Sequence, residues 1–154
     1  MTQAQPTVTV RPIAAGDRDA WARLFVDYGV FYETAFDESV LSGVWGWITD
    51  ASHEVNAVVA TDDAGDLVGF AHYRRQADTF TAGTGWTLDD LYVSPDARGS
   101  GAATALIDAV VAAATAGGGG TLRWITAADN ARAQRVYDRV ATRAGWVTYE
   151  KELG

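Results

Sequence analysis

The chain has 154 residues, no cysteine and a formal net charge of −8, and 48% of its residues are hydrophobic. This length and composition predict a single globular domain over residues 1–154 and exclude disulfides, thiol nucleophiles and cysteine metal sites. Between residues 17 and 66 eleven acids stand against two bases. This imbalance argues against a nucleic-acid partner and leaves two readings open, attraction of a cationic small substrate or solubility alone.

The N-terminal stretch and the hydropathy pattern bear on location. The first residues, MTQAQPT, lack the basic and apolar regions of a signal peptide. No apolar run approaches the roughly 20 residues that a membrane span needs. We therefore expect a cytoplasmic protein with no membrane partner.

The first half of the chain alternates between patterns of strand and helix. Apolar residues at three- and four-residue spacing indicate two helices, and residues that alternate in polarity indicate strands. A hairpin turn is predicted at 62–66 and a loop at 83–85. The elements expected here are a strand at 8–13, helices starting near Asp17 and Asp37, and strands at 54–61, 67–76 and 87–93.

The second half is predicted to continue as helix, strand, helix, strand. The fifth strand is expected to run parallel to the fourth, because a helical crossover separates them. These elements are a helix from Ala102 to the glycines at 117–120, a strand at 122–126, a helix from Asn130 to Gly145 and a closing strand at 146–150. The fold class is therefore α/β, with the order β-α-α-β-β-β-α-β-α-β.

The segment with the strongest functional signal lies between the fourth strand and the alanine-rich helix. It reads SPDARGSGAA over residues 94–103. Pro95 interrupts the strand, and Gly99 and Gly101 let the backbone approach an anion with no Cβ in the way. The N–H groups at the positive end of the following helix and the guanidinium of Arg98 complete a predicted phosphate-binding loop.

This segment resembles the acetyl-CoA-binding signature of the GNAT (general N-acetyltransferase) superfamily, Q/R-x-x-G-x-G/A. The signature here reads Arg98-Gly99-Ser100-Gly101-Ala102-Ala103. The run NARAQRVYDRVATRAGW, from Asn130, is similar to the second signature of the family. The resemblance covers nearly the whole chain and implies a mixed, mostly antiparallel sheet with a splayed parallel pair and helices on both faces. It also implies a homodimer, for which we expect the sheet edge near 146–150.

The resemblance implies roles for individual residues. The residues that it implies for acetyl-CoA are Leu91, Tyr92 and Val93 along the pantetheine arm, residues 98–103 at the pyrophosphate, and Asn130 on the arm. Tyr137 matches the family's tyrosine near the thioester sulfur. Because a phenol stays protonated at neutral pH, Tyr137 is expected to donate a proton to the departing thiolate. The alternative is a core tyrosine, since Tyr137 lies on the apolar stripe of its helix.

The base that receives the amine proton is predicted less specifically. Asp89 and Asp90 are neighbours on a strand, so their side chains are expected on opposite faces. The segment LDDLYV resembles the L-E-D segment of spermidine/spermine acetyltransferase-like members, in which the acid matching Asp89 lies close to the amine. Asp89 is therefore the first candidate for the base, directly or through a water, and Asp90 is a candidate substrate ligand. A polar strand end without a catalytic role is the alternative.

Candidates for the acceptor pocket lie near the first two helices. Tyr28, Tyr32 and Glu33 combine aromatic faces with a carboxylate, a combination that suits a primary ammonium group. The alternative for the aromatic residues is the core. His53 and His72 are isolated and show no metal-ligand spacing, so we interpret them as surface or sheet residues and expect no metal.

These features predict an acetyl-CoA-dependent N-acetyltransferase that acts on a small primary amine by direct attack, with polyamine-like or amino-acid-like acceptors. Two alternatives stay open: a peptide or protein amine as acceptor, and a catalytically silent CoA-binding domain that acts as a sensor. A dinucleotide-binding module is disfavoured, because Thr104 departs from G-x-G-x-x-G/A and antiparallel strands precede the loop.

Overall fold

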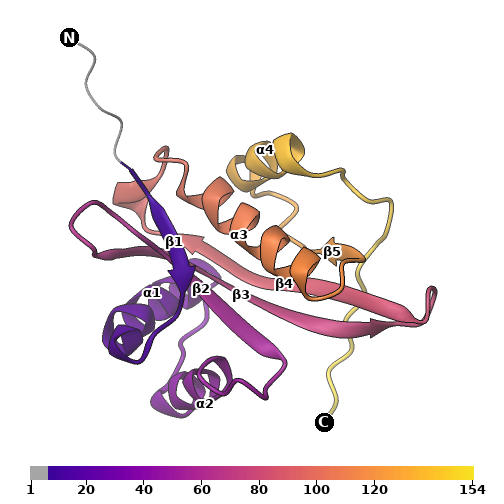
Figure 1. Cartoon of the computed structure of the whole chain (residues 1–154), viewed down its shortest axis with the longest axis horizontal. Coiled ribbons are helices and arrows are strands. Elements are labelled where there is room, and N and C mark those ends of the chain that lie inside the picture. The colour runs from indigo at the N-terminus through magenta and orange to yellow at the C-terminus, as the bar shows by residue number, and fades with distance from the viewer. Residues whose placement is uncertain (1–6) are drawn as a thin grey trace.

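The computed structural model describes residues 7–154, so the expectation about a signal peptide falls almost wholly outside it. Within this range a five-stranded sheet is combined with four helices (Figure 1). The strands are β1 (Thr9–Pro12), β2 (Val55–Thr61), β3 (Leu67–Asp78), β4 (Gly83–Val93) and β5 (Thr121–Arg123). The helices are α1 (Arg18–Phe31), α2 (Glu38–Ile48), α3 (Ala102–Ala116) and α4 (Ala131–Val140). None of these helices is both long and apolar enough to cross a membrane.

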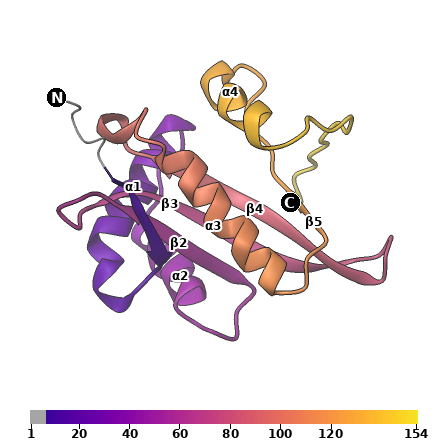
Figure 2. The ribbon, with the colours of Figure 1, turned by 45° about the horizontal axis from the view of Figure 1, so that its top comes forward.

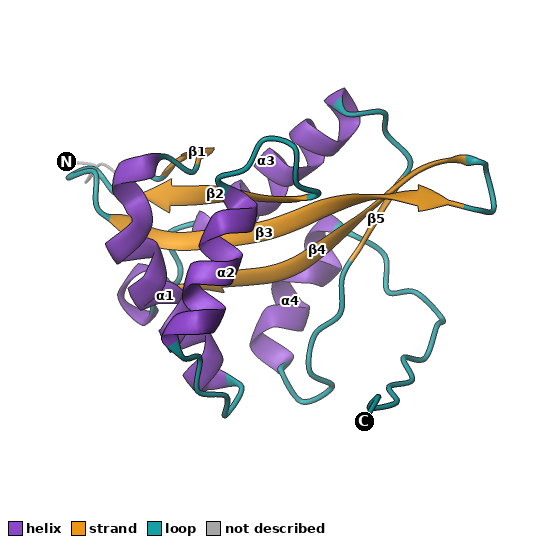
Figure 3. Cartoon of the chain, turned by 90° about the horizontal axis from the view of Figure 1, so that it is seen from below, coloured by secondary structure: helices purple, strands orange, loops and turns teal. Residues whose placement is uncertain are grey.

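The sheet follows the chain order, β1-β2-β3-β4-β5. The first four strands pair antiparallel, and β4 pairs parallel to β5. This confirms the parallel crossover expected from the helix between them. α1 and α2 cover one face of the sheet, and α3 and α4 lie on the other (Figures 1 and 3). The predicted fold class, a mixed sheet with helices on both faces, is therefore confirmed.

Each face of the sheet carries its own hydrophobic core. Leu106 of α3 is fully buried in one, and Trp21 of α1 and Phe70 of β3 are fully buried in the other. Because both faces are covered, β3 is buried on both sides over its middle. Alternate side chains of β3 therefore enter opposite cores: Phe70 and His72 face α1, while Tyr73 faces α3.

Three predicted boundaries differ from the structure. β4 begins at Gly83, because the residues predicted as a loop pair with the end of β3, Gly85 with Gln76. β5 ends at Arg123. α4 ends at Val140, before Gly145. All residues after Val140 are exposed, so the apolar stripe has no surface to pack against, and helix propensity alone does not extend a short helix.

The closing strand expected at 146–150 is wrong. This segment has no regular structure, and Trp146 and Tyr149 are 77% and 92% exposed. Its β-branched and aromatic residues favour a strand, but a strand also needs a neighbour for its backbone hydrogen bonds. The chain after α4 instead runs as a loop past the end of β5 (Figure 2). The strand edge on which we based the homodimer is therefore not formed, and the homodimer itself stays a prediction.

Candidate functional site

β4 and β5 pair over a short stretch and then separate. The parallel register runs from Gly85 opposite Thr121 to Thr87 opposite Arg123. β5 ends there, whereas β4 continues to Val93. Over residues 88–93 β4 pairs with β3 on one side, and none of the described strands pairs with it on the other. Backbone N–H and C=O groups of this stretch, which includes the predicted cofactor residues 91–93, therefore face an opening in the sheet.

The predicted phosphate-binding loop follows β4 directly. Gly99 and Gly101 take left-handed φ values of +83° and +85°. A Cβ atom built on either glycine meets no atom within 4 Å, so the face of the loop is open and the glycines serve the backbone conformation. The first N–H groups of α3, from Ala102 onward, have no acceptor inside the helix and lie at its positive end. The loop thus has the shape and polarity of an anion cradle.

Two side chains of this loop have different surroundings. Arg98 is exposed, so its guanidinium is accessible to a ligand. The N–H and hydroxyl groups of Ser100 both donate to the carbonyl of Ala97. Ser100 was predicted to donate to the pyrophosphate, but both of its donors stabilise the turn instead.

A β-bulge lies in β4 at Asp89. His72 of β3 pairs with Asp90, and the next residue of β3 pairs with Leu88, so Asp89 has no partner of its own. Leu88 and Leu91 both face the α3 core, and the two acids between them both line a cavity of about 320 Å³ on the other side of the sheet. The expectation that the acids point to opposite faces is therefore wrong, because the extra residue interrupts the alternation of side chains.

Asp89 is paired with a neighbouring cation. Its two carboxylate oxygens accept hydrogen bonds from Nε of Arg74, at 3.2 and 3.0 Å. Burial raises the pKa of Asp89, and the Arg74 guanidinium opposes this rise. About a third of each side chain is exposed. Asp89 is thus already engaged in an ion pair at the wall of the cavity.

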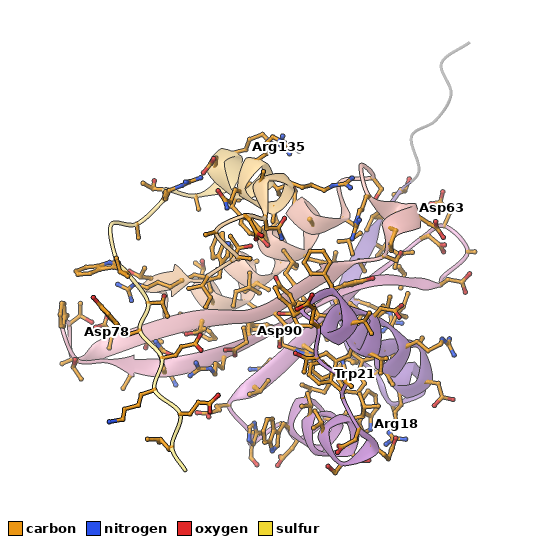
Figure 4. The ribbon with its side chains drawn as sticks, turned by 180° about the vertical axis from the view of Figure 1, so that it is seen from behind. Arg18, Trp21, Asp63, Asp78, Asp90 and Arg135 are labelled. Atoms are coloured by element: carbon orange, nitrogen blue, oxygen red, sulfur yellow. The ribbon has the colours of Figure 1, made fainter. Side chains whose placement is uncertain are left out.

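Asp90 is instead held by a buried histidine. Nδ1 of His72 lies 2.8 Å from Oδ2 of Asp90, and Trp21 Nε1 donates to Nε2 of His72 at 3.0 Å. His72 is 2% exposed and Trp21 is completely buried, whereas the side chain of Asp90 is 25% exposed. Asp90 lies on the sheet beside the helical layer that contains Trp21 (Figure 4). Asp90 is therefore the accessible end of a chain of three hydrogen-bonded side chains.

Tyr28 of α1 lies beside Asp90 and close to two other tyrosines. The ring of Tyr28 packs against those of Tyr32 and Tyr92, at centroid distances of 5.0 and 6.2 Å. Burial raises the pKa of Tyr28, and the charge of Asp90 and a hydrogen bond to Asp90 raise it further; Tyr32 and Tyr137 lie within electrostatic reach of Tyr28. Burial likewise raises the pKa of Tyr137 to about 12. Both partly buried phenols therefore keep their protons at neutral pH.

α4 carries the remaining predicted residues. Oδ1 of Asn130 caps the helix by accepting from the N–H of Ala133 at 3.1 Å, which leaves its amide NH₂ group to donate elsewhere. Tyr137 meets Trp124 edge-to-face at 5.5 Å. Tyr137 also lines a cavity of about 1080 Å³ between β5, α4 and the segment 141–148, which contains neither Asp89 nor Asp90. We therefore locate the candidate active site by its acids and tyrosines, and not by the size of a cavity.

Of the predicted site residues, Tyr28 and Tyr32 pack against each other, and Tyr28 lies beside Asp90 and within electrostatic reach of Tyr137. Glu33 is exposed in the turn after α1, with φ of +55°. Sequence reasoning missed His72 and Trp21. A signal for His72 existed, because it stands two residues after Phe70 in the alternation of β3 and so faces a core, where a histidine needs hydrogen-bond partners. Within residues 7–154 no three His, Asp or Glu side chains gather as metal ligands would.

The chain resembles known acetyltransferases in sequence and in fold. Residues 18–141 match the sequence model of the acetyltransferase (GNAT) family. A D-amino-acid N-acetyltransferase of Saccharomyces cerevisiae is 30% identical over 145 residues, which cover 94% of this chain and 90% of that protein. The structure of a ribosomal-protein-alanine N-acetyltransferase from Brucella melitensis biovar Abortus has a TM-score of 0.80 at 23% identity, covering 96% of this chain and 100% of that one. An aminoglycoside N-acetyltransferase in complex with CoA has a TM-score of 0.82 at 18% identity, covering 99% of both chains.

Proposed function

Because the chain belongs to the GNAT family of acetyltransferases, we propose that it transfers the acetyl group of acetyl-CoA to a small primary amine by direct attack. The observation that carries this proposal is Asp90, held by His72 beside Tyr28 on the part of β4 that has separated from β5. β4 carries Asp90 and ends at Val93, and a short 3₁₀ turn, Pro95–Ala97, leads from it to the glycine loop. One strand therefore positions both the carboxylate that we assign as the base and the predicted phosphate site.

The residues around the loop fit acetyl-CoA as the co-substrate. The open backbone at Gly99 and Gly101, the N-terminus of α3 and the guanidinium of Arg98 suit a pyrophosphate. The free edge of β4 at residues 91–93 suits the extended, amide-containing pantetheine arm, which can pair as an added strand would. Bound there, acetyl-CoA supplies the acetyl carbon and a thiol leaving group. The free amide NH₂ of Asn130 can donate to the arm.

We assign the base to Asp90 in preference to Asp89, the first candidate from the sequence, because both oxygens of Asp89 bind the Arg74 guanidinium, whereas His72 binds only Oδ2 of Asp90. Asp90 binds the acceptor ammonium and takes one proton from it, which leaves a neutral amine whose lone pair attacks the acetyl carbon. Tyr137, whose pKa is about 12, keeps its proton until the C–S bond breaks and then donates it to the sulfur. The second proton of the nitrogen returns to the Tyr137 oxygen, and Asp90 releases its proton to solvent, so the products are the amide and the thiol of CoA.

An amino-acid-like acceptor is our first choice. The similarity to a D-amino-acid N-acetyltransferase supports it. Polyamine-like acceptors come second, supported by the acidic stretch at residues 17–66.

The test is thiol release from acetyl-CoA with a panel of D- and L-amino acids, polyamines, aminoglycosides and peptides. We expect release with one amine class, strongest with amino acids, and loss of it in Asp90→Asn and Tyr137→Phe. Transfer only to peptides would replace the acceptor class. Tight acetyl-CoA binding without transfer to any amine would refute the enzymatic proposal and favour the CoA-binding sensor.

A further inference from the structure

We propose that Trp21 and His72 are positioning residues for this reaction: Trp21 fixes His72 in a single tautomer, and His72 holds Asp90 with one carboxylate oxygen free for the acceptor amine. The inference rests on the proposed function, because it needs Asp90 to receive the amine proton. It extends that function to two residues that do not touch the reactants.

The hydrogen-bonding capacities of the three groups determine the tautomer. An indole N–H can only donate, so Nε2 of His72, 3.0 Å from Trp21 Nε1, must be the acceptor and carries no proton. The proton of the imidazole therefore lies on Nδ1, 2.8 Å from Oδ2 of Asp90. Nδ1–H donates to the carboxylate, and the direction of both hydrogen bonds in the chain is defined.

The surroundings of His72 fix the position of its ring. Its ring lies 4.7 Å from Phe70, 5.1 Å from Phe25 and 5.9 Å from Trp21, measured between centroids, and 2% of the residue is exposed. A proton on Nε2 would point at the indole N–H of Trp21, so that two donors would oppose each other. Rotation of the ring would break both hydrogen bonds inside a close-packed core.

The hydrogen bond from His72 fixes the orientation of the Asp90 carboxylate. Oδ2 accepts from His72, so Oδ1 is the oxygen left for the acceptor ammonium, and the phenol of Tyr28 lies within hydrogen-bonding reach of the same carboxylate. The competing partner in the cavity is Arg74, which already binds the neighbouring Asp89. Without the Nδ1–H donor, Asp90 can turn towards that guanidinium and away from the amine. A misdirected base lowers the rate of the chemical step far more than it affects binding of acetyl-CoA.

Two isosteric variants separate this role from packing. In His72→Asn the side-chain amide can place its NH₂ where Nδ1–H stood, which keeps the donor to Asp90. In His72→Gln the amide reaches the position of Nε2, which keeps the contact with Trp21 and loses the donor. We expect His72→Gln to lower kcat on the order of ten- to a hundredfold, with KM for acetyl-CoA within about twofold. We expect His72→Asn to stay within about fivefold of the unmodified chain.

The matched control is Val59→Ala, in the same core on β2, where Val59 is fully buried. It lowers the melting temperature without touching the hydrogen-bonded chain, so kcat at a temperature well below unfolding is expected to stay unchanged. Equal kcat values for His72→Asn and His72→Gln would overturn the proposal. A loss in Val59→Ala as large as that in His72→Gln would also overturn it, because core stability alone would then explain the effect.

Nitrogen-15 NMR of the histidine rings at neutral pH gives a readout that does not depend on turnover. The unmodified chain is expected to show His72 as the pure Nδ1–H tautomer, and Trp21→Phe is expected to show a mixture, because nothing then selects Nε2 as the acceptor. An Nε2–H tautomer in the unmodified chain would overturn the proposal whatever the kinetics. Absence of acetyl transfer to any amine would instead refute the proposed function and, with it, the catalytic role, while the tautomer lock would be judged by NMR alone.

Discussion

The assignment of the base makes a sharp prediction, because the two candidates are adjacent in sequence and differ only in their partners. Replacing Asp90 by Asn keeps an oxygen that can accept from Nδ1 of His72, and removes the charge that binds the ammonium and takes its proton. A positioned general base contributes about 10²- to 10⁴-fold in rate. We therefore expect kcat/KM for the amine to fall by at least about a hundredfold in Asp90→Asn, with little change in melting temperature.

Asp89→Asn is the matched comparison. It removes the ion pair with Arg74, in which the hydrogen bonds from Nε of Arg74 to Asp89 measure 3.2 and 3.0 Å. The side chains of both residues are about a third exposed. An exposed pair of this kind stabilises a protein by less than about 1 kcal/mol. We expect kcat/KM within about threefold of the unmodified chain and a melting temperature lower by a few degrees at most.

Thiol release under steady-state conditions, with saturating acetyl-CoA and varied amine, measures both variants. Binding of acetyl-CoA by calorimetry serves as the control that the cofactor site is intact. The reverse order of effects, with Asp89→Asn inactive and Asp90→Asn active, would refute the reasoning. It would mean that the ion pair with Arg74 opens in the complex and that Asp89 acts on the amine, directly or through a water.

Three further predictions follow from single residues. The pKa of Tyr137 is about 12, against about 10 when exposed, so its neutral form contributes stability that is complete below about pH 10 and is lost as pH rises towards 12. Tyr137→Phe should therefore lessen the alkaline fall in the free energy of unfolding, measured by urea denaturation, by on the order of 2 kcal/mol, while lowering kcat about tenfold or more. Gly101→Ala should raise KM for acetyl-CoA at least tenfold, whereas Gly65→Ala, at the same φ of +85° and equally open, should cost a similar ~1 kcal/mol of stability and leave KM unchanged. The Arg11 guanidinium lowers the pKa of Asp17, so this pair contributes stability above about pH 4 that is lost as pH falls through the lowered pKa, and Asp17→Asn should flatten the acid limb of the melting-temperature profile.

The order of elements and the glycine loop could be predicted from the sequence, because they depend on short-range patterns. Helix periodicity, strand alternation and the φ requirement of Gly99 and Gly101 are written into neighbouring residues. The bulge at Asp89 is different, because it is a property of the register between β3 and β4, and the segment LDDLYV is equally compatible with regular alternation. One extra residue decides that both acids face α1, so the sequence could not rank Asp90 above Asp89.

Two other features depend on partners that a local pattern does not contain. Trp21 and His72 are 51 positions apart, and neither belongs to a motif, so their hydrogen bond becomes visible only when α1 packs on β3. The segment 146–150 has the composition of a strand, but the chain offers it no strand edge in this structure. In both cases the tertiary neighbour, and not the local sequence pattern, decides the outcome.

The two cores of the molecule divide the work of the site through β4. The glycine loop and the start of α3 belong to the core on one face, where Ala102 and Leu106 are buried. Asp90 is held from the core on the other face through His72 and Trp21. Because β4 is shared, the two halves are fixed relative to each other by covalent geometry and by the β3 ladder. Substitutions in the α3 core should therefore act first on acetyl-CoA affinity, and substitutions around Trp21 should act first on the chemical step, since each core supports the group that it contacts.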